Sequence, residues 1–137
     1  MKKVSIIVPM FNEEEAAPIF FERVEKVINE NKEYNFEIVA VNDGSTDKTL
    51  EILLEKQKSL SNLVVVDLSR NWGHESAVTA GLQEASGDCL IPIDADLQDP
   101  PEIIPEMLAM WEDGFQVVNA KRCNRKKICR LVGIFRR

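Results

Sequence analysis

The sequence is poor in cysteine and histidine and contains no long apolar run. Its 137 residues include three cysteines and one histidine. The cysteines show no Cys-x-x-Cys spacing, and an odd number favours neither a disulfide framework nor a zinc site. No stretch of about 18 apolar residues occurs, so we expect no segment that spans a bilayer. The chain enters an apolar run at Val4 without a secretory signal pattern, and we expect a cytoplasmic protein.

Glycine-rich phosphate-binding motifs are also missing. There is no G-x-G-x-x-G after the first apolar run and no G-x-x-x-x-G-K-[ST] anywhere in the chain. Dinucleotide-binding and P-loop proteins use such loops to hold phosphate through backbone N–H groups. If this chain binds a phosphorylated ligand, other groups must hold the phosphate.

Basic residues are scarce outside the last part of the chain. The net charge is -6, yet residues 121–137 contain eight of the 17 basic residues and none of the 23 acidic ones. Because a nucleic-acid-binding domain spreads basic charge over a folded face, the acidic body argues against a nucleic-acid partner. In the basic tail, residues 126–137, four apolar residues fall on one helical face: Ile128, Leu131, Val132 and Phe135. Such an amphipathic helix would either bind a membrane surface or pack against a further part of the protein.

Short apolar runs alternate with helical patterns. We predict strands over Val4–Pro9, Phe36–Val41, Leu63–Leu68, Cys89–Ile93 and Phe115–Ala120, and helices over Glu13–Asn31, Thr46–Lys58, Glu75–Ala85 and Glu102–Trp111. Ser45 or Thr46 is the expected N-cap of the second helix. Strand–helix alternation with short connections predicts one α/β domain over residues 1–125, with a Rossmann-like, doubly wound, mostly parallel sheet.

Polar residues follow the end of every predicted strand, where ligands bind in open parallel sheets. The pair Asp94 and Asp96 is the most informative. Two carboxylates so close repel each other unless a cation is near, and hard oxygen ligands favour Mg²⁺ or Mn²⁺. Gln98 offers a further oxygen, and a metal ion here would neutralise a diphosphate leaving group. Taken alone, such a pair is often two solvated loop acids, so its position at a strand end carries the prediction.

Other residues at these strand ends have two interpretations each. Asp43 either accepts hydrogen bonds from a nucleobase or ribose, or belongs to a turn that only starts the next helix. We interpret His74 as a structural residue at a helix start and not as a general base. Arg70 pairs with a phosphate or with one of the many acids.

Four segments together resemble the family 2 glycosyltransferases of GT-A fold. They are SIIVPMFNEEE, IVAVNDGSTDKT, SRNWGHESAVTAGL and GDCLIPIDADLQDPPE. The run RNWGHESAVTAGL followed by DADLQDPPE is similar to the polyprenyl-phosphate branch, which includes dolichol-phosphate mannosyltransferases and bactoprenol glucosyltransferases. The resemblance ends near residue 125, whereas family members continue through an acceptor-binding half. We therefore expect a C-terminally truncated chain that binds nucleotide sugar and transfers the sugar poorly.

The resemblance implies an inverting, metal-dependent transfer of a sugar from a UDP- or GDP-sugar, with UDP preferred, to a polyprenyl phosphate at the inner face of the cell membrane. A polysaccharide hydroxyl acceptor and a non-catalytic nucleotide-binding module are the alternatives. The nucleotide-sugar-binding residues implied are Pro9, Phe11, Glu13, Val41, Asp43, Asp94, Ala95, Asp96 and Arg122.

The same resemblance assigns the metal ligands. Asp96 and Gln98 would hold Mg²⁺ or Mn²⁺, Asp96 would thereby assist the leaving group, and the catalytic base is not assigned. Phe11 stands where many relatives have tyrosine, and Asn42 stands where many have aspartate.

Overall fold

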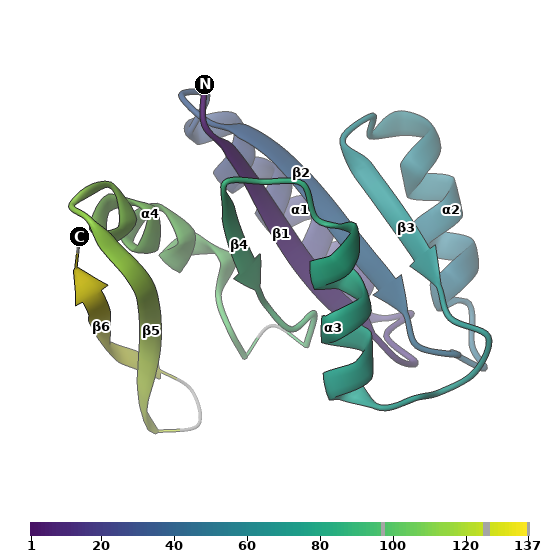
Figure 1. Ribbon diagram of the computed structural model, residues 1–137. Coiled ribbons are helices and arrows are strands. Elements are labelled where there is room, and N and C mark those ends of the chain that lie inside the picture. Colours follow the sequence, from purple (N-terminus) through teal and green to yellow (C-terminus); the bar gives the residue numbers. More distant parts are fainter. Residues whose placement is uncertain (97, 125–126, 137) are drawn as a thin grey trace.

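Four parallel strands form the central sheet in the order β3-β2-β1-β4 (Figure 1). The computed structural model describes residues 1–96, 98–124 and 127–136. The strands are β1 (Lys3–Met10), β2 (Asn35–Asn42), β3 (Leu63–Asp67) and β4 (Cys89–Pro92). In β1 every residue after Lys3 is buried. A near-continuous apolar run is typical of a strand covered on both faces, as observed here.

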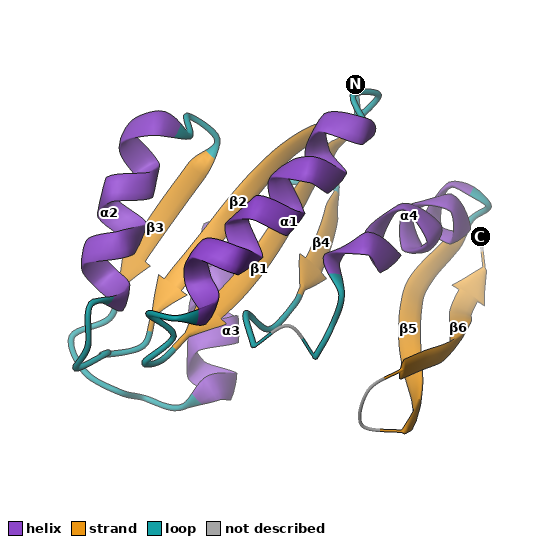
Figure 2. Ribbon diagram, turned by 180° about the vertical axis from the view of Figure 1, so that it is seen from behind, coloured by secondary structure: helices purple, strands orange, loops and turns teal. Residues whose placement is uncertain are grey.

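Helices cover both faces of this sheet (Figure 2). Helices α1 (Ala16–Glu30) and α2 (Thr49–Ser59) lie on one face, and α3 (His74–Glu84) lies on the other. The 3-10 helix η1 (Pro101–Ile103) leads into α4 (Ile104–Glu112). None of the helices in the described part of the chain combines the length and apolar character needed to cross a membrane. The predicted doubly wound α/β arrangement is confirmed.

Side chains of β1 alternate between two hydrophobic cores. Ile6 and Val8 belong to the larger core, together with Phe20 and Phe21 of α1. Ile7 points to the opposite face and belongs to the smaller core beneath α3. Fully burying a side chain of this size contributes about 1.5–3 kcal/mol. Both helical layers are therefore anchored on the same central strand.

Helix α3 approaches the sheet through a glycine. A Cβ atom on Gly81 would lie 2.4 Å from Cγ2 of Ile7 and 3.1 Å from Cγ2 of Val41. Glycine costs about 1 kcal/mol relative to alanine inside a helix. Here it permits a helix-to-sheet contact that a larger residue would block.

The prediction for residues 115–120 is wrong in one respect. They form a strand, but β5 (Phe115–Asn124) does not join the central sheet. It pairs antiparallel with β6 (Lys127–Arg136) in a separate two-stranded sheet. The structure therefore adds an antiparallel hairpin to the expected parallel architecture.

The prediction of a helical tail over residues 126–137 is also wrong, because its described residues form β6. Three of the apolar residues there, Ile128, Val132 and Ile134, are β-branched and favour extended backbone. Gly133 faces Phe115 so closely that a Cβ atom would lie 2.4 Å from the ring. A larger residue would therefore disturb the hairpin.

The helix boundaries shift by a few residues. Helix α1 begins at Ala16 and α2 at Thr49, each three residues after its predicted start. Neither Ser45 nor Thr46 caps α2. Instead, a carboxylate oxygen of Asp47 accepts hydrogen bonds from the backbone N–H and the hydroxyl of Thr49.

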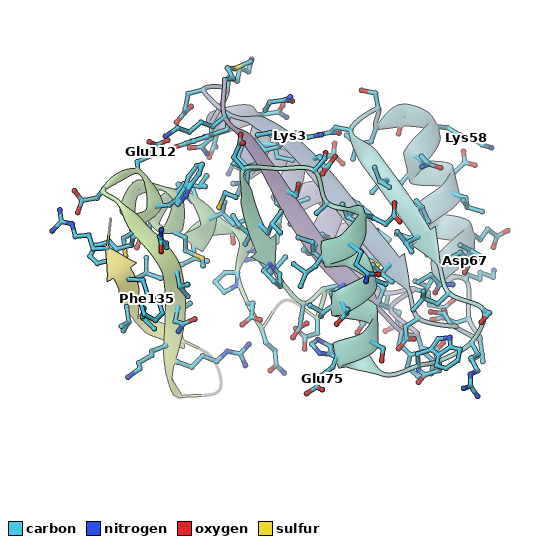
Figure 3. All side chains as sticks on the ribbon, viewed as in Figure 1. Lys3, Lys58, Asp67, Glu75, Glu112 and Phe135 are labelled. Carbon is cyan, nitrogen blue, oxygen red and sulfur yellow. The ribbon has the colours of Figure 1, made fainter. Side chains whose placement is uncertain are left out.

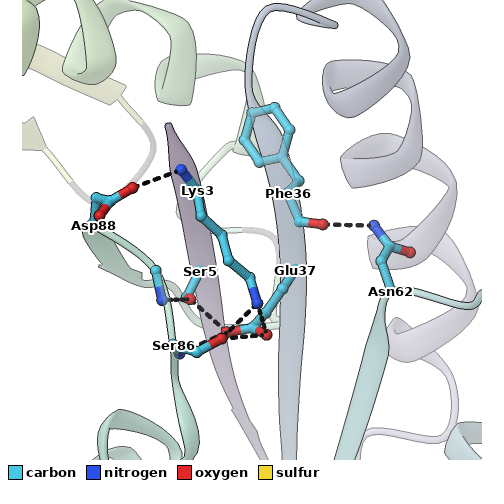
Figure 4. Close-up of polar contacts among 8 residues, drawn as sticks. Lys3, Ser5, Phe36, Glu37, Asn62, Ser86 and Asp88 are labelled. Carbon is cyan, nitrogen blue, oxygen red and sulfur yellow. Dashed lines mark hydrogen bonds and ion pairs between the residues drawn. The ribbon is translucent and has the colours of Figure 1, made fainter. Parts of the chain in front are cut away.

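A polar network holds Glu37 toward the amino-terminal edge of the sheet (Figure 4). Its carboxylate accepts hydrogen bonds from the Ser5 hydroxyl at 2.6 Å and from the Ser86 backbone N–H at 2.8 Å. The Lys3 ammonium lies 2.8 Å from the other oxygen. Burial alone would raise the pKa of Glu37, but the hydrogen bonds from Lys3, Ser5 and Ser86 outweigh it and lower this pKa to about 2.

This network predicts a pH-dependent contribution to stability. The folded-state pKa of Glu37 lies below the ordinary value of 4.5. Its ionised side chain therefore stabilises the fold above that pH, and the contribution is lost as the pH falls toward 2. We expect Glu37→Gln to lower the free energy of unfolding at pH 7 by about 1–3 kcal/mol, and by less at pH 3. Urea denaturation followed by circular dichroism measures both differences.

The matched control is Glu55→Gln, because Glu55 pairs with Lys58 on the exposed surface of α2. An exposed pair of this kind contributes roughly 0–1 kcal/mol. Equal stability of Glu37→Gln and wild type at pH 7 would contradict the role assigned to the network.

Candidate functional site

The loops after the strands of the central sheet lie together at its carboxyl edge (Figure 1). The side chains of Asp67 and Glu75 lie toward this end of the molecule, and Lys3 lies at the other (Figure 3). Parallel strands bring all their carboxyl ends to one edge, which is where ligands bind in such sheets. The geometry of these loops therefore decides what the chain can bind.

Side chains join the loop after β1 to the loop after β2. Asn12 adopts a φ of 52°, and its Oδ1 accepts a hydrogen bond from the Thr46 backbone N–H at 2.8 Å. The Asn12 N–H donates to the Ser45 hydroxyl at 3.0 Å. The Glu13 N–H donates to the Thr49 hydroxyl at 2.9 Å. Glu13 is thus fixed by the start of α2.

Asp43 holds the loop after β3. Its Oδ1 accepts a hydrogen bond from the Trp72 backbone N–H at 2.7 Å, and its Oδ2 accepts one from the Gly73 N–H at 3.1 Å. Gly44 has a φ of 67°, and a Cβ atom there would lie 2.2 Å from the backbone nitrogen of Asn71. The turn after β2 therefore packs tightly against the loop after β3 and positions it.

A cleft of about 340 Å³ opens between these loops. It is lined by the end of β1, the turn after β2, the loop leading into α3, and the residues that follow β4. The lining residues are Pro9, Met10, Phe11, Glu13, Asp43, Asn71, Gly73, His74, Ala77, Asp94, Ala95 and Asp96. Its size, polar side chains and place at the sheet edge are those of a small-molecule site.

Negative charge is concentrated in this cleft. Glu13, Asp94 and Asp96 all line it. Burial raises the pKa of Glu13, and the charges of Asp96, Asp47 and Asp94 raise it further. Like charges at this density disfavour ionisation unless positive charge is near. The cleft is therefore suited to a cation or to a ligand that carries one.

One cationic side chain reaches this region from β5. The Arg122 guanidinium contacts the carboxylate of Asp99. This hydrogen bond, followed by the charges of Asp99, Asp96 and Asp94, raises the pKa of Arg122. A permanently charged guanidinium beside a carboxylate cluster is a suitable partner for phosphate.

Comparison with known proteins decides the family. Residues 5–128 match the model of Glycosyl transferase family 2. The chain belongs to this family. Among its relatives is the prophage bactoprenol glucosyl transferase homolog of Escherichia coli (strain K12), which is 47% identical over 129 residues, covering 94% of this chain and 42% of the relative.

A second relative is the undecaprenyl-phosphate 4-deoxy-4-formamido-L-arabinose transferase of Photorhabdus laumondii. It is 40% identical over 127 residues, covering 92% of this chain and 39% of the relative. This family 2 chain thus spans about two fifths of the length of the curated relatives it matches.

Solved structures of glycosyltransferases share its fold. Residues 1–349 of TarS from S. aureus, in complex with UDP-GlcNAc, match with a TM-score of 0.56 and 29% identity, covering 82% of this chain and 32% of that one. The mannosyltransferase PcManGT from Pyrobaculum calidifontis, in complex with GDP-Man and Mn²⁺, also has a TM-score of 0.56, with 27% identity and coverage of 69% and 28%. The predicted GT-A fold and family are confirmed.

The structure brings seven of the residues proposed for nucleotide-sugar binding to the cleft. They are Pro9, Phe11, Glu13, Asp43, Asp94, Ala95 and Asp96. Both carboxylate oxygens of Asp43 already accept backbone hydrogen bonds, so this side chain shapes the cleft wall in addition to any contact with a ligand.

Three other predicted site residues lie outside the cleft lining. Val41 is fully buried in the smaller core under α3. Gln98 is exposed, and its backbone N–H donates to Oδ1 of Asp96 at 3.1 Å. Arg122 stands beside the acidic residues through its contact with Asp99.

Five lining residues are not among those proposed from the sequence for nucleotide-sugar binding. They are Met10, Asn71, Gly73, His74 and Ala77. His74, which we interpret from the sequence as structural, has its Nε2 2.7 Å from Oδ1 of Asp94. The rule that ligands bind at carboxyl ends pointed to Asn71 and His74 as well, because both follow the third strand.

The cleft carboxylates do not form a complete metal site by themselves. Within the described ranges, no group of three or more His, Cys, Asp or Glu side chains is arranged to hold a metal ion. Mg²⁺ commonly takes one or two protein carboxylates and fills its remaining positions with water and substrate phosphates. Asp96, exposed on the cleft wall with Gln98 close by in the chain, is compatible with a site of that kind.

Proposed function

We propose that this chain is the nucleotide-sugar-binding part of a glycosyltransferase that takes a sugar from a nucleoside diphosphate sugar, preferably a UDP-sugar. The observation that carries the proposal is the cleft at the carboxyl edge, which is lined by Glu13, Asp94 and Asp96. Arg122 lies outside this lining and contacts Asp99. Family membership supports the reaction class. TarS in complex with UDP-GlcNAc and PcManGT in complex with GDP-Man support the class of donor.

The cleft offers chemistry for each part of such a donor. Phe11 is 45% exposed and presents an aromatic face on which a nucleobase can stack. Carboxylate and amide groups of Asp94 and Asn71 can hydrogen-bond ribose hydroxyls. The Arg122 guanidinium contacts Asp99 in this structure, and it can reorient to bind the diphosphate.

A divalent cation fits the same arrangement. Asp96 with Gln98 would hold Mg²⁺ or Mn²⁺, and the surrounding carboxylates supply the negative potential that attracts it. When bound, the ion neutralises charge on the leaving diphosphate. The Mn²⁺ bound by PcManGT supports this assignment.

The acceptor we propose is a polyprenyl phosphate. The support comes from relatives named bactoprenol glucosyl transferase and undecaprenyl-phosphate transferase. A phosphate monoester has its second pKa near about 6 and is largely ionised at pH 7. Its oxygen can attack the anomeric carbon of the sugar without a general base. Attack in line with the departing diphosphate inverts the configuration.

Such an acceptor places the reaction at a membrane, and we assign the inner face of the cell membrane. The β5–β6 hairpin replaces the expected helix as the element that contacts it. Val117 pairs with Ile134 across the hairpin, and both are exposed. Phe135 is 71% exposed, and Lys121 adds an exposed basic side chain. Apolar and basic groups together favour an anionic lipid surface.

The donor site is tested by titration calorimetry with UDP. We expect wild-type protein to bind UDP more tightly with Mn²⁺ than without it. Asp96→Ala should weaken binding at least about tenfold in Mn²⁺ and change it little without metal, because the carboxylate acts through the cation. The same titration with GDP identifies the preferred base.

The matched control is Asp113→Ala, which removes the same charge from an exposed position that pairs with Arg136 of the hairpin. It should leave UDP affinity within about twofold of wild type, since exposed distant charges are screened. Absence of UDP binding to wild type, with or without Mn²⁺, would contradict the proposed function.

The acceptor is tested by incubating the protein with labelled UDP-glucose and vesicles that contain undecaprenyl phosphate. We expect slow, metal-dependent formation of a glucosyl phospholipid, detected by mass spectrometry of the lipid extract. Label found only in an added polysaccharide would instead support a hydroxyl acceptor. Nucleotide binding without any transfer to either acceptor would favour a non-catalytic binding module.

A further inference from the structure

The first residue of α3 reaches across the cleft to the loop after β4. His74 Nε2 lies 2.7 Å from Oδ1 of Asp94, and both residues line the cleft. An ionised carboxylate can only accept a hydrogen bond, so Nε2 carries the proton in this contact. The imidazole therefore acts as a donor that fixes one oxygen of Asp94.

His74 and Asp94 each follow a residue that is held by hydrogen bonds of its backbone. Gly73, directly before His74, donates its N–H to Asp43, and its carbonyl accepts the N–H of Ala77 at 3.0 Å. On the other side, the N–H of Ile93, directly before Asp94, donates to the carbonyl of Ile7 at 2.9 Å. The contact thus joins two segments that are each held in place.

The hydrogen bond from His74 fixes the orientation of the Asp94 carboxylate, which lies near charges of both signs. Asp94 acts electrostatically on Glu13, which repels it, and on Arg122, which attracts it. Within the described part of the chain, its Oδ2 has no hydrogen-bond partner, whereas Oδ1 is held by His74. One oxygen is thereby left free to accept a hydrogen bond from a ligand in the cleft.

We propose that His74 is a positioning residue for the nucleoside: it holds Asp94 so that Oδ2 accepts a hydrogen bond from a ribose hydroxyl. This inference rests on the proposed binding of a nucleotide sugar. A carboxylate that accepts ribose hydroxyls is a common device in nucleotide sites at the carboxyl edge of a parallel sheet. His74 does not need to touch the nucleotide to act in this way.

The inference predicts a change in ribose discrimination. Titration calorimetry compares UDP with 2′,3′-dideoxy-UDP, which lacks both hydroxyls, in the presence of Mn²⁺. A hydrogen bond to a charged group contributes enough for wild type to prefer UDP about tenfold or more. His74→Phe keeps a ring but has no donor, and it should reduce this preference to about twofold. His74→Gln retains an N–H donor and should keep most of it.

Two further variants separate positioning from a general effect on folding. Glu75→Ala alters the neighbouring exposed residue of α3 and should leave the preference unchanged. In an Asp94→Ala background, His74→Phe should have no further effect on the preference, because the group it positions is gone.

The outcomes distinguish this inference from the proposed function. If His74→Phe weakens both ligands equally and keeps the wild-type preference, the positioning role is wrong. If wild type binds UDP but does not prefer it to the dideoxy form, the role is also wrong while the nucleotide site stands. If wild type binds neither ligand, the proposed function itself is overturned.

Discussion

The gathering of Glu13, Asp94 and Asp96 in one cleft is the constraint on which the rest of the site depends. Burial raises the pKa of Glu13, and the charges of Asp96 and Asp94 raise it further, so the cleft favours a nearby positive charge. The chain supplies a positive charge through Arg122, which contacts Asp99, whereas His74 makes a hydrogen bond to Asp94. A diphosphate entering alone would add further negative charge. The cleft therefore accounts for the binding of a nucleotide sugar only if a cation enters with it.

The parallel part of the fold was predictable because its signals are local. Strand β1 is a short apolar run buried on both faces, and α1 carries its buried residues at helical spacing. The hairpin was not predictable in the same way. Apolar residues of the tail, such as Leu131 and Val132, fit one face of a helix as well as an extended strand. What decides between them is pairing with β5, a contact with another segment.

The same distinction applies to the candidate site, where some residues were predictable from the sequence and the contacts between loops were not. The rule that ligands bind at the carboxyl edge identified Asp94 and Asp96 from the sequence, and the family resemblance added Glu13. It could not give the two backbone hydrogen bonds of Asp43 or the contact between His74 and Asp94. Those contacts join residues 29, 30 and 20 positions apart, and they depend on how closely the loops pack.

A crystal structure of the protein with UDP and Mn²⁺, with the anomalous signal of manganese recorded, tests the central claim most directly. We expect an anomalous peak within coordination distance of an Asp96 carboxylate oxygen, with the diphosphate on its other side and the nucleoside between Phe11 and Asp94. A nucleotide bound elsewhere would contradict it, for example in the hollow between α1 and α2 lined by Phe21 and Lys56. So would a manganese ion without contact to Asp96.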